Sequence, residues 1–400
     1  MPKLSARHRV PHRSPPSLEG FMKITYVHNA PVPSLAANAV QVASMCAAFQ
    51  AAGAETRLVQ PADGGTAEEI RAHYGLKADF AVSRLRRLPL PASELLYGAL
   101  ATLLYGPRSA GIVYSRSPSV GMAAALLGQP FALEMHVPAS AIRERLARRL
   151  ARLVASPQFR GLIVISARLK EDYEQRYPAL RGRVFVAHDG AEVAAPARPL
   201  PLQGAFKVGY VGQLYPGKGM EIIADLVPLC PWATFHIVGG APRDVADWRA
   251  RLAGHANVIF HGHVRHADTP SWIEGMDAVL APYLRMVRGV GGGSQNLADW
   301  MSPLKIFEYM SRGKPIVASD LPVLREVLSH GENALLCPPE EPAAWASALL
   351  ALKDDEKLRA RIGRQGEKDF LARYTWDQRA RAILGAIDAA LSYGLSDSRT

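Results

Sequence analysis

Short apolar runs alternate along the chain with longer stretches in which apolar residues recur every three or four positions. The apolar runs cover residues 23–27, 56–59, 111–115, 131–135, 161–166 and 184–187 in the first half, and 206–211, 234–238, 257–261, 278–282, 315–319 and 334–337 in the second. Continuous runs of this length are typical of parallel strands buried on both faces. Between the first two runs, Val42, Met45, Cys46 and Phe49 share one face of a helix that we expect Gly53 to end.

A proline-rich segment without periodicity, residues 191–205, separates two series of strands and helices. The pattern predicts an α/β fold of two Rossmann-like, doubly wound domains. We expect a first domain at 22–195, a second at 196–375, and at 376–400 a C-terminal helix that packs back toward the first domain, followed by a frayed tail. Ligands of such sheets bind at the carboxyl ends of the strands, here in the cleft where the two domains face each other.

The net charge of the chain favours some classes of binding partner over others. The chain has 400 residues and a formal net charge of +11. Residues 1–21 are predicted to be a disordered basic leader, with Met22 as a candidate start; without its four bases and one acid the net charge falls to +8. A basic balance favours nucleic acid, a membrane surface or a phosphorylated substrate. Nucleic acid is the weakest of these, because the sequence lacks RNP aromatics, a helix-turn-helix and zinc fingers.

Cysteine usage and hydropathy indicate a cytoplasmic protein. Three cysteines lie far apart without a CxxC pair, which argues against a disulfide scaffold and a structural zinc site. No apolar stretch approaches the roughly 20 residues of a membrane span. Residues 140–160 hold six arginines around an apolar stripe, which predicts either a solvated basic helix or one that lies on an anionic membrane surface.

Two segments carry candidate chemistry. In the first, residues 209–219, a strand ends at Gly212 and a helix begins near Gly219, so that free backbone N–H groups and Lys218 form an anion site. A plain loop with a solvated lysine is the alternative.

In the second segment, residues 302–322, Ser302 is expected to cap a helix that has Pro303 at its first position and Leu304 on its packed face. Lys305 and Glu308 share one face of that helix. The alternative is a surface pair worth about 0.3 kcal/mol.

The chain resembles the retaining glycosyltransferases of family 4, called group 1, which have the GT-B fold. The resemblance covers residues 22 to 391. The residues that carry it lie at 26–38, 132–138, 164–170, 211–219, 236–240, 257–264 and 302–322. It implies transfer of a sugar from a UDP- or GDP-sugar donor to a glycan or lipid-linked acceptor, with retention of configuration and without a metal or other cofactor.

The resemblance also implies roles for individual residues. Lys218 would neutralise the donor diphosphate, Glu308 would accept hydrogen bonds from the ribose, and His136 would lie across the cleft near the reacting sugar. The backbone from Ser302 through Pro303 and Leu304 to Lys305 would approach the sugar and the diphosphate.

Other residues would complete the donor site. Gly239 and the turn that ends at Val264 would flank the base, and Asn29 with the loop that follows would line the wall of the first domain. Gln213 stands where the family has an arginine, and Trp300 stands where it has the first of two glutamates. Lys305 is our candidate for the missing positive charge. Arg285 and Arg288, in the glycine-rich loop 285–296, are candidates to reach donor or acceptor, or to lie on a mobile surface.

The leading hypothesis is therefore a retaining glycosyltransferase of the cytosol, peripheral on the inner membrane face. A non-catalytic nucleotide- or glycan-binding protein of the same fold and a GT-B nucleotide-sugar epimerase are the alternatives. His236, His261, His263 and His266 are weak candidates for a metal site, and His188 with Asp189 for a charge relay.

Overall fold

The computed structural model describes residues 22–34, 36–87, 93–107, 110–142, 144–193, 195–288 and 296–396. Within this part, all strand pairs of the two sheets are parallel. The predicted leader, the end of the predicted tail and residues 289–295 of the glycine-rich loop lie outside the described residues.

The first sheet has the strand order β3-β2-β1-β4-β5-β6-β7. Its strands are β1 Lys23–Val27, β2 Glu55–Pro61, β3 Ala81–Leu85, β4 Gly111–Ser115, β5 Phe131–Met135, β6 Phe159–Val164 and β7 Val184–Val186. The helices between them are α1 Ala37–Ala51, α2 Ala67–Tyr74, α3 Ser93–Tyr105, α4 Pro118–Leu126, α5 Glu144–Val154 and α6 Ala167–Arg176.

The second sheet has the order β10-β9-β8-β11-β12-β13. Its strands are β8 Lys207–Val211, β9 Thr234–Val238, β10 Val258–Gly262, β11 Ala278–Ala281, β12 Ile316–Ser319 and β13 Leu335–Cys337. Its helices are α7 Met220–Leu229, α8 Pro242–Arg251, α9 Thr269–Glu274, α10 Leu304–Ser311, α11 Pro342–Asp354 and α12 Glu356–Arg373, and α13 Trp376–Ser396 follows. The prediction of two doubly wound α/β units is confirmed.

The twelve predicted strands are all present, and the sequence missed only β3. This strand lies at the edge of its sheet, and of its five residues only Ser83 is buried. An edge strand needs no continuous apolar run, so the hydrophobic pattern gave no signal there.

The prediction of a basic amphipathic helix within residues 140–160 corresponds to α5. Its apolar residues Leu150 and Leu153 are buried in the core of the first domain. This apolar face is therefore covered by the protein and is not free for a bilayer. No described helix is both long and apolar enough to cross a membrane.

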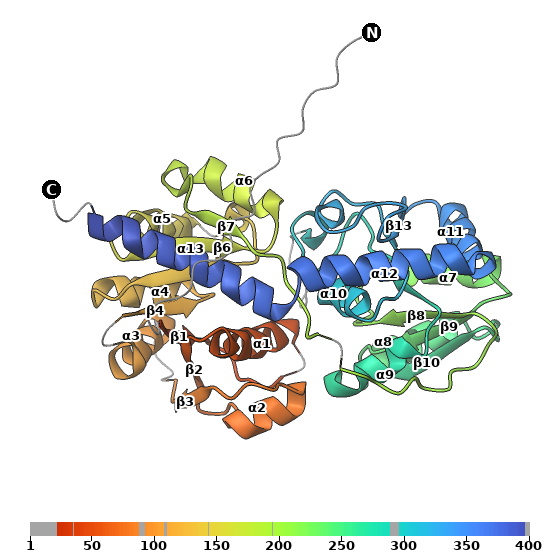
Figure 1. Cartoon of the computed structure of the whole chain (residues 1–400), viewed down its shortest axis with the longest axis horizontal. Coiled ribbons are helices and arrows are strands. Elements are labelled where there is room, and N and C mark those ends of the chain that lie inside the picture. The colour runs from red at the N-terminus through yellow and green to blue at the C-terminus, as the bar shows by residue number, and fades with distance from the viewer. Residues whose placement is uncertain are drawn as a thin grey trace, which may run out of the picture.

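The chain crosses between the domains twice. Figure 1 shows α12 along the second domain and α13 along the first. The first crossing, at Gly190 and Ala191, runs beside the second, where Ala191 pairs with Thr375. A Cβ on Gly190 would lie only 2.6 Å from the Tyr374 carbonyl oxygen, so only glycine allows this approach.

After the second crossing, α13 packs against α1. Ile383, Leu384 and Ile387 join the core that contains Val42 and Phe49 of α1. The C-terminal helix is thereby part of the first domain's hydrophobic core.

Leu384→Ala tests this packing. Leu384 is fully buried, so we expect its truncation to lower the free energy of unfolding by about 2–5 kcal/mol. The matched control is Leu371→Ala in α12, where the side chain is 47% exposed and the loss should be small. Denaturant unfolding measures both. Equal losses would contradict the packing of α13 described here.

Candidate functional site

Two lysines lie at the carboxyl end of β8. Lys218 precedes α7, and Lys305 is in the first turn of α10. The ammonium of Lys305 is 3.7 Å from the centroid of the Tyr210 ring and 5.2 Å from that of Tyr283. The ammonium of Lys218 is 5.5 Å from the same Tyr283 ring. The two lysines therefore flank one tyrosine.

The backbone at the end of β8 leaves room for Lys305. Gly212 has φ 148°, and a Cβ there would lie 2.9 Å from the Lys305 Nζ atom. Gly239 has φ 109°, and a Cβ on it would lie 2.2 Å from the Gly212 carbonyl oxygen. Glycine is required at both positions because of the positive φ and the close contact.

In the described part of the chain, neither Lys218 nor Lys305 forms an ion pair with a carboxylate. Lys305 is 9% exposed, and its Nζ atom has no hydrogen-bond partner among the described residues. Burial, and then the charge of Lys218, lower the pKa of Lys305 well below its usual value. Burial also lowers the pKa of Lys218. A buried cation without a partner is costly, so this site favours an anionic ligand.

Glu308 lies one turn after Lys305 on α10, and its carboxylate meets His266 at the loop after β10. The His266 Nε2 atom is 3.0 Å from Glu308 Oε1. Burial alone would lower the pKa of His266, but the hydrogen bond and charge of Glu308 raise it overall. The Tyr74 ring of the first domain packs edge-on against His266, 6.3 Å between centroids.

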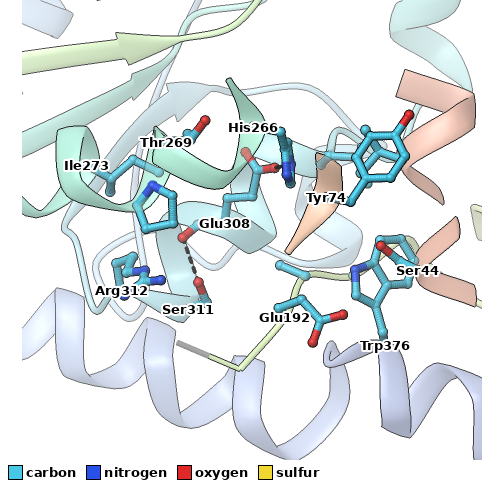
Figure 2. Close-up of a pocket in the computed structure, with 15 residues that line it drawn as sticks. Ser44, Tyr74, Glu192, His266, Thr269, Ile273, Glu308, Ser311, Arg312 and Trp376 are labelled. Atoms are coloured by element: carbon cyan, nitrogen blue, oxygen red, sulfur yellow. Dashed lines mark hydrogen bonds and ion pairs between the residues drawn. The ribbon is translucent and has the colours of Figure 1, made fainter. Parts of the chain in front are cut away.

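A cavity opens beside this pair, between the two domains (Figure 2). Its empty volume is about 540 Å³. The first domain contributes Val40, Ser44 and Tyr74, the crossings contribute Gly190, Ala191, Glu192 and Trp376, and the second domain contributes His266, Thr269, Pro270, Ile273, Leu304, Glu308, Ser311 and Arg312. A ligand bound at Glu308 would therefore contact both domains and the hinge.

Ser302 is not the cap of α10, and that expectation is wrong. Pro303 occupies the N-cap position without a side-chain hydrogen bond. The Ser302 hydroxyl instead accepts a hydrogen bond of 2.8 Å from the backbone N–H of Asp189, in the first crossing. Ser302 thus ties the start of α10 to the hinge, and the helix N-terminus keeps its free N–H groups.

The first domain contributes His136 and Asn29 at the carboxyl ends of its strands. His136 follows β5, and its Nε2 atom is 2.6 Å from Glu134 Oε1. Asn29 follows β1 and donates from Nδ2 to Glu94 Oε1 at 3.0 Å. Both side chains are therefore held by carboxylates of their own domain.

Trp300 and Gln213, the two positions at which this sequence differs from the family pattern, have different surroundings. Trp300 packs against the core of the first domain, with the guanidinium of Arg168 5.7 Å from its ring centroid. The backbone oxygen of Gln213 accepts a 2.6 Å hydrogen bond from the Tyr210 hydroxyl. Trp300 thus serves as a contact between the domains where the family places a carboxylate.

Several of the weaker candidate site residues interact with other residues of the protein. Arg285 pairs with Glu340 at 2.6 Å. His236 and His261 lie 3.0 Å apart, and His236 also contacts the Gln203 carbonyl oxygen. The sequence did not predict the pairing of His266 with Glu308, because 42 residues separate them and no motif links them.

Among the described residues, Glu134, His136 and Asp189 form the one trio with metal-ligand spacing. The Arg379 guanidinium lies 2.7 Å from Glu134 and 3.9 Å from Asp189. Arg379 supplies the positive charge that these carboxylates need, and we infer no metal site from them.

Comparison with known proteins finds a family similarity over part of the chain. The family model of glycosyl transferases group 1 matches residues 205–355. Phosphatidyl-myo-inositol mannosyltransferase of Mycolicibacterium smegmatis is 29% identical over 186 residues, which is 45% of this chain and 44% of that protein. D-inositol 3-phosphate glycosyltransferase of Stackebrandtia nassauensis is 27% identical over 226 residues, 54% of this chain and 48% of that protein. The chain spans just under half the length of these curated relatives.

Solved structures extend the similarity to the whole fold. HepE of Anabaena, solved with UDP, has a TM-score of 0.68 at 18% identity and covers 92% of this chain and 100% of its own. A glycosyltransferase of Rickettsia africae has a TM-score of 0.73 at 13% identity. The similarity covers 93% of this chain and 99% of that protein. The fold is GT-B, and the resemblance to group 1 glycosyltransferases is confirmed, with the family match in residues 205–355.

Lys305→Met tests the uncompensated charge. We expect the ligand-free variant to gain about 1–3 kcal/mol in unfolding free energy, because a buried ammonium without a partner is removed. The unfolded state holds that proton more tightly, so wild-type stability rises with pH and the gain shrinks toward the usual pKa of lysine.

The control is Lys314→Met. The ammonium of Lys314 donates hydrogen bonds to the carbonyl oxygens of Glu274 and Met276 at 2.8 and 3.1 Å, so its loss should destabilise the protein. Urea unfolding from pH 7 to 9.5 measures both variants. A Lys305→Met variant less stable than wild type would contradict this expectation and would show that the Tyr210 and Tyr283 rings offset the cost of burying the ammonium.

Proposed function

We propose that the chain is a retaining glycosyltransferase that moves a hexosyl group from a nucleotide-diphosphate sugar, UDP- or GDP-linked, to a glycan, a glycolipid or a similar acceptor. Neither a metal nor another cofactor is part of the proposed reaction.

The observation that carries the proposal is the pair of unneutralised lysines, Lys218 and Lys305, at the end of β8. When the glycosidic bond to a nucleotide diphosphate breaks, negative charge grows on the departing phosphate oxygens. Fixed cations and free N–H groups at the start of α10 stabilise that charge more than the ground state, which is the condition for a faster reaction. Lys305 would supply the charge that the family takes from the arginine at the position of Gln213.

The remaining proposed contacts to the donor are those that the family resemblance implies. Glu308 would accept hydrogen bonds from the ribose hydroxyls, with His266 holding its carboxylate. Gly239 and Val264 would flank the base. His136 and Asn29 would face the sugar and the acceptor from the first domain. The leaving phosphate would take the acceptor proton on the same face of the sugar, so no second protein carboxylate is required.

The comparisons with known proteins support a nucleotide-sugar donor. HepE of Anabaena was solved with UDP, and again with UDP-glucose, and the first curated relatives transfer mannose to phosphatidyl-myo-inositol. These are properties of those proteins, and for this chain they make a nucleotide-sugar donor and a polyol or lipid-linked acceptor the first compounds to test.

The presence of Trp300 supports a second candidate function, that of a non-catalytic nucleotide-binding protein. A carboxylate at that position would reach the donor sugar in the family, and here an indole packs on the first domain instead. Binding of nucleotide sugars without turnover in any acceptor screen would support this candidate. A nucleotide-sugar epimerase has no comparable support, because we find no acid and base placed for it among the described residues.

We further propose that the first domain docks on an anionic membrane surface on the cytoplasmic side. Leu103 and Leu104 end α3, and Leu126 and Leu127 end α4, with exposures of 68%, 54%, 74% and 40%. The helices α3 and α4 pack together, and α5, which packs on α4, carries exposed arginines. Exposed leucines beside arginines suit a bilayer with negative headgroups.

Donor binding is tested by thermal shift with UDP, GDP and their sugars. A ligand at 100 times its Kd stabilises the native state by about 2.7 kcal/mol, so the preferred nucleotide should stand out. We expect Lys218→Ala and Lys305→Ala to abolish most of the shift, and Lys353→Ala to keep it, because the Lys353 ammonium already pairs with Asp354 at 2.7 Å. No shift with any nucleotide would contradict the proposed function.

Turnover is then measured with the preferred donor. Lys305→Ala should raise the donor KM or lower kcat by orders of magnitude, since a fixed cation at a developing charge is worth about 10²–10³-fold. ¹H NMR of the glycosylated product should show the anomeric configuration of the donor. A wild-type rate in Lys305→Ala, or the opposite anomer, would contradict this part of the proposal.

Membrane docking is measured by sedimentation with vesicles that contain phosphatidylglycerol. Leu126→Ser should weaken binding several-fold because an exposed apolar contact is lost. Leu371→Ser, an exposed leucine of α12 in the second domain, is the control and should bind as wild type. Binding that does not depend on phosphatidylglycerol, or equal loss in both variants, would exclude this surface.

A further inference from the structure

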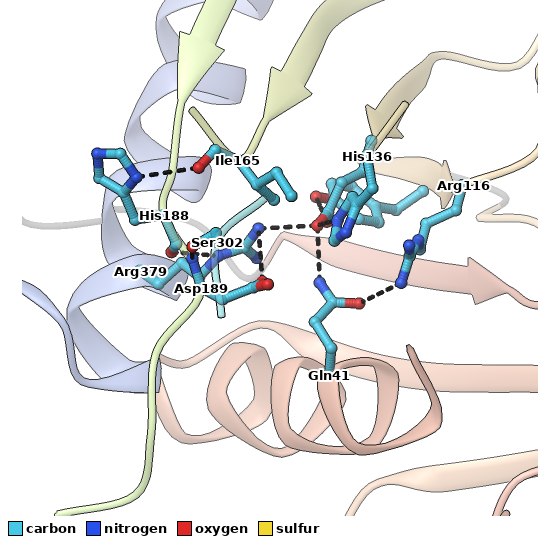
Figure 3. Close-up of polar contacts among 10 residues, drawn as sticks. Gln41, Arg116, His136, Ile165, His188, Asp189, Ser302 and Arg379 are labelled. Atoms are coloured by element: carbon cyan, nitrogen blue, oxygen red, sulfur yellow. Dashed lines mark hydrogen bonds and ion pairs between the residues drawn. The ribbon is translucent and has the colours of Figure 1, made fainter. Parts of the chain in front are cut away.

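A buried polar network joins the first domain to the C-terminal helix, and Figure 3 shows Gln41, His136 and Arg379 pointing toward one another in it. Glu134 is at its centre. Glu134 lies on β5 and is fully buried. Its carboxylate accepts hydrogen bonds from four side chains, namely Gln41 of α1 at 2.7 Å, Tyr114 of β4, His136 at 2.6 Å and Arg379 of α13 at 2.7 Å. A carboxylate so fully coordinated is fixed in position and orientation.

Glu134 is ionised in this network. Burial alone would raise the pKa of Glu134, but the charge of Arg379 and the hydrogen bond from His136 hold it well below its usual range. An ionised carboxylate only accepts hydrogen bonds. The Nε2 atom of His136, 2.6 Å away, must therefore carry a proton and donate it.

The other ring nitrogen of His136 is then the free one. Burial and the charge of Arg116 lower the pKa of His136, and Glu134 and Asp189 oppose this only in part. The imidazole is thus neutral near pH 7, with its lone pair on Nδ1. In the described part of the chain no hydrogen bond to that atom is present.

His136 is more exposed than the carboxylate and the guanidinium at the centre of the network. Its side chain is 14% exposed, whereas the side chains of Glu134 and Arg379 are 0% and 2% exposed. It follows β5 directly, at the carboxyl end of the sheet, where ligands of doubly wound folds bind.

The positive charge that balances Glu134 comes from Arg379, which is 245 positions later in the sequence. Its Nη2 atom donates to Glu134, and its Nε atom donates to the His188 carbonyl oxygen at 2.9 Å. Asp189 lies 3.9 Å from Nη2, and its own N–H is held by Ser302. The charged groups that face His136 are therefore Glu134, Arg116, Asp189 and Arg379.

Buried charge pairs of this kind contribute little net stability, because desolvation offsets their attraction. Their better-attested use is to hold a reactive group in one geometry and one protonation state.

We propose that Glu134 and Arg379 are positioning residues for His136. Glu134 fixes the Nε2–H tautomer, so that Nδ1 accepts a hydrogen bond from a hydroxyl of the transferred sugar, and Arg379 keeps Glu134 ionised and ties this arrangement to the C-terminal helix. The role toward the sugar rests on the proposed function, but the tautomer does not.

The first experiment is a long-range ¹H–¹⁵N spectrum of the histidine rings of the wild-type protein. The signals of His136 are identified by their absence in His136→Asn. We expect the neutral Nε2–H pattern at pH 7, and a disturbed pattern in Glu134→Gln. Glu326→Gln is the control, because Glu326 accepts from the N–H of Ala167 at 2.7 Å and does not contact His136. An Nδ1–H tautomer or an imidazolium at pH 7 would overturn the proposal, whether or not Glu134→Gln folds.

The second experiment is a double-mutant cycle on donor turnover. We expect Glu134→Gln to lower kcat by about 10- to 100-fold with a smaller change in donor KM. Glu134→Gln combined with His136→Asn should lose no more than His136→Asn alone, because one residue acts through the other. Losses that multiply would overturn the positioning role. If wild type turns over no nucleotide sugar, the proposed function fails, and the NMR result still decides the tautomer.

Discussion

The candidate site of the second domain is organised around two lysine ammonium groups that lie against one tyrosine ring in a largely desolvated place. Lys218 and Lys305 flank the Tyr283 ring, and no carboxylate neutralises either of them in the described part of the chain. Keeping them there requires Gly212 with no side chain, the rings of Tyr210 and Tyr283, and the end of β8. Such an arrangement is unfavourable for the protein alone and becomes favourable when an anion binds.

In the first domain, by contrast, the buried charge of Glu134 is paired. Its carboxylate receives four hydrogen bonds, and one of them comes from Arg379 near the other end of the chain. One domain therefore presents unneutralised positive charge, and the other presents a neutral histidine in a fixed orientation. The two crossings, joined at Ala191 and Thr375 and tied to α10 through Ser302, set the distance between them.

Much of the fold could be predicted from the sequence, because buried parallel strands are continuous apolar runs, and Lys218 beside the free N–H groups of a helix start gave the candidate anion site. Edge strand β3 could not, since its exposed residues leave no such run. The role of Ser302 was misread because a serine before a proline looks like a cap, and only the fold shows that the N–H of Asp189 competes for it. The Glu134–Arg379 and His266–Glu308 pairs join residues 245 and 42 positions apart, and local patterns carry no information on such contacts.

The most direct test of the central claim is a crystal structure of the protein with the nucleoside diphosphate that it prefers. The account predicts the diphosphate between Lys218 and Lys305, with phosphate oxygens about 2.7–2.9 Å from their Nζ atoms, as in charge-assisted hydrogen bonds. A nucleotide bound elsewhere, with both ammonium groups still unpaired beside Tyr283, would contradict it.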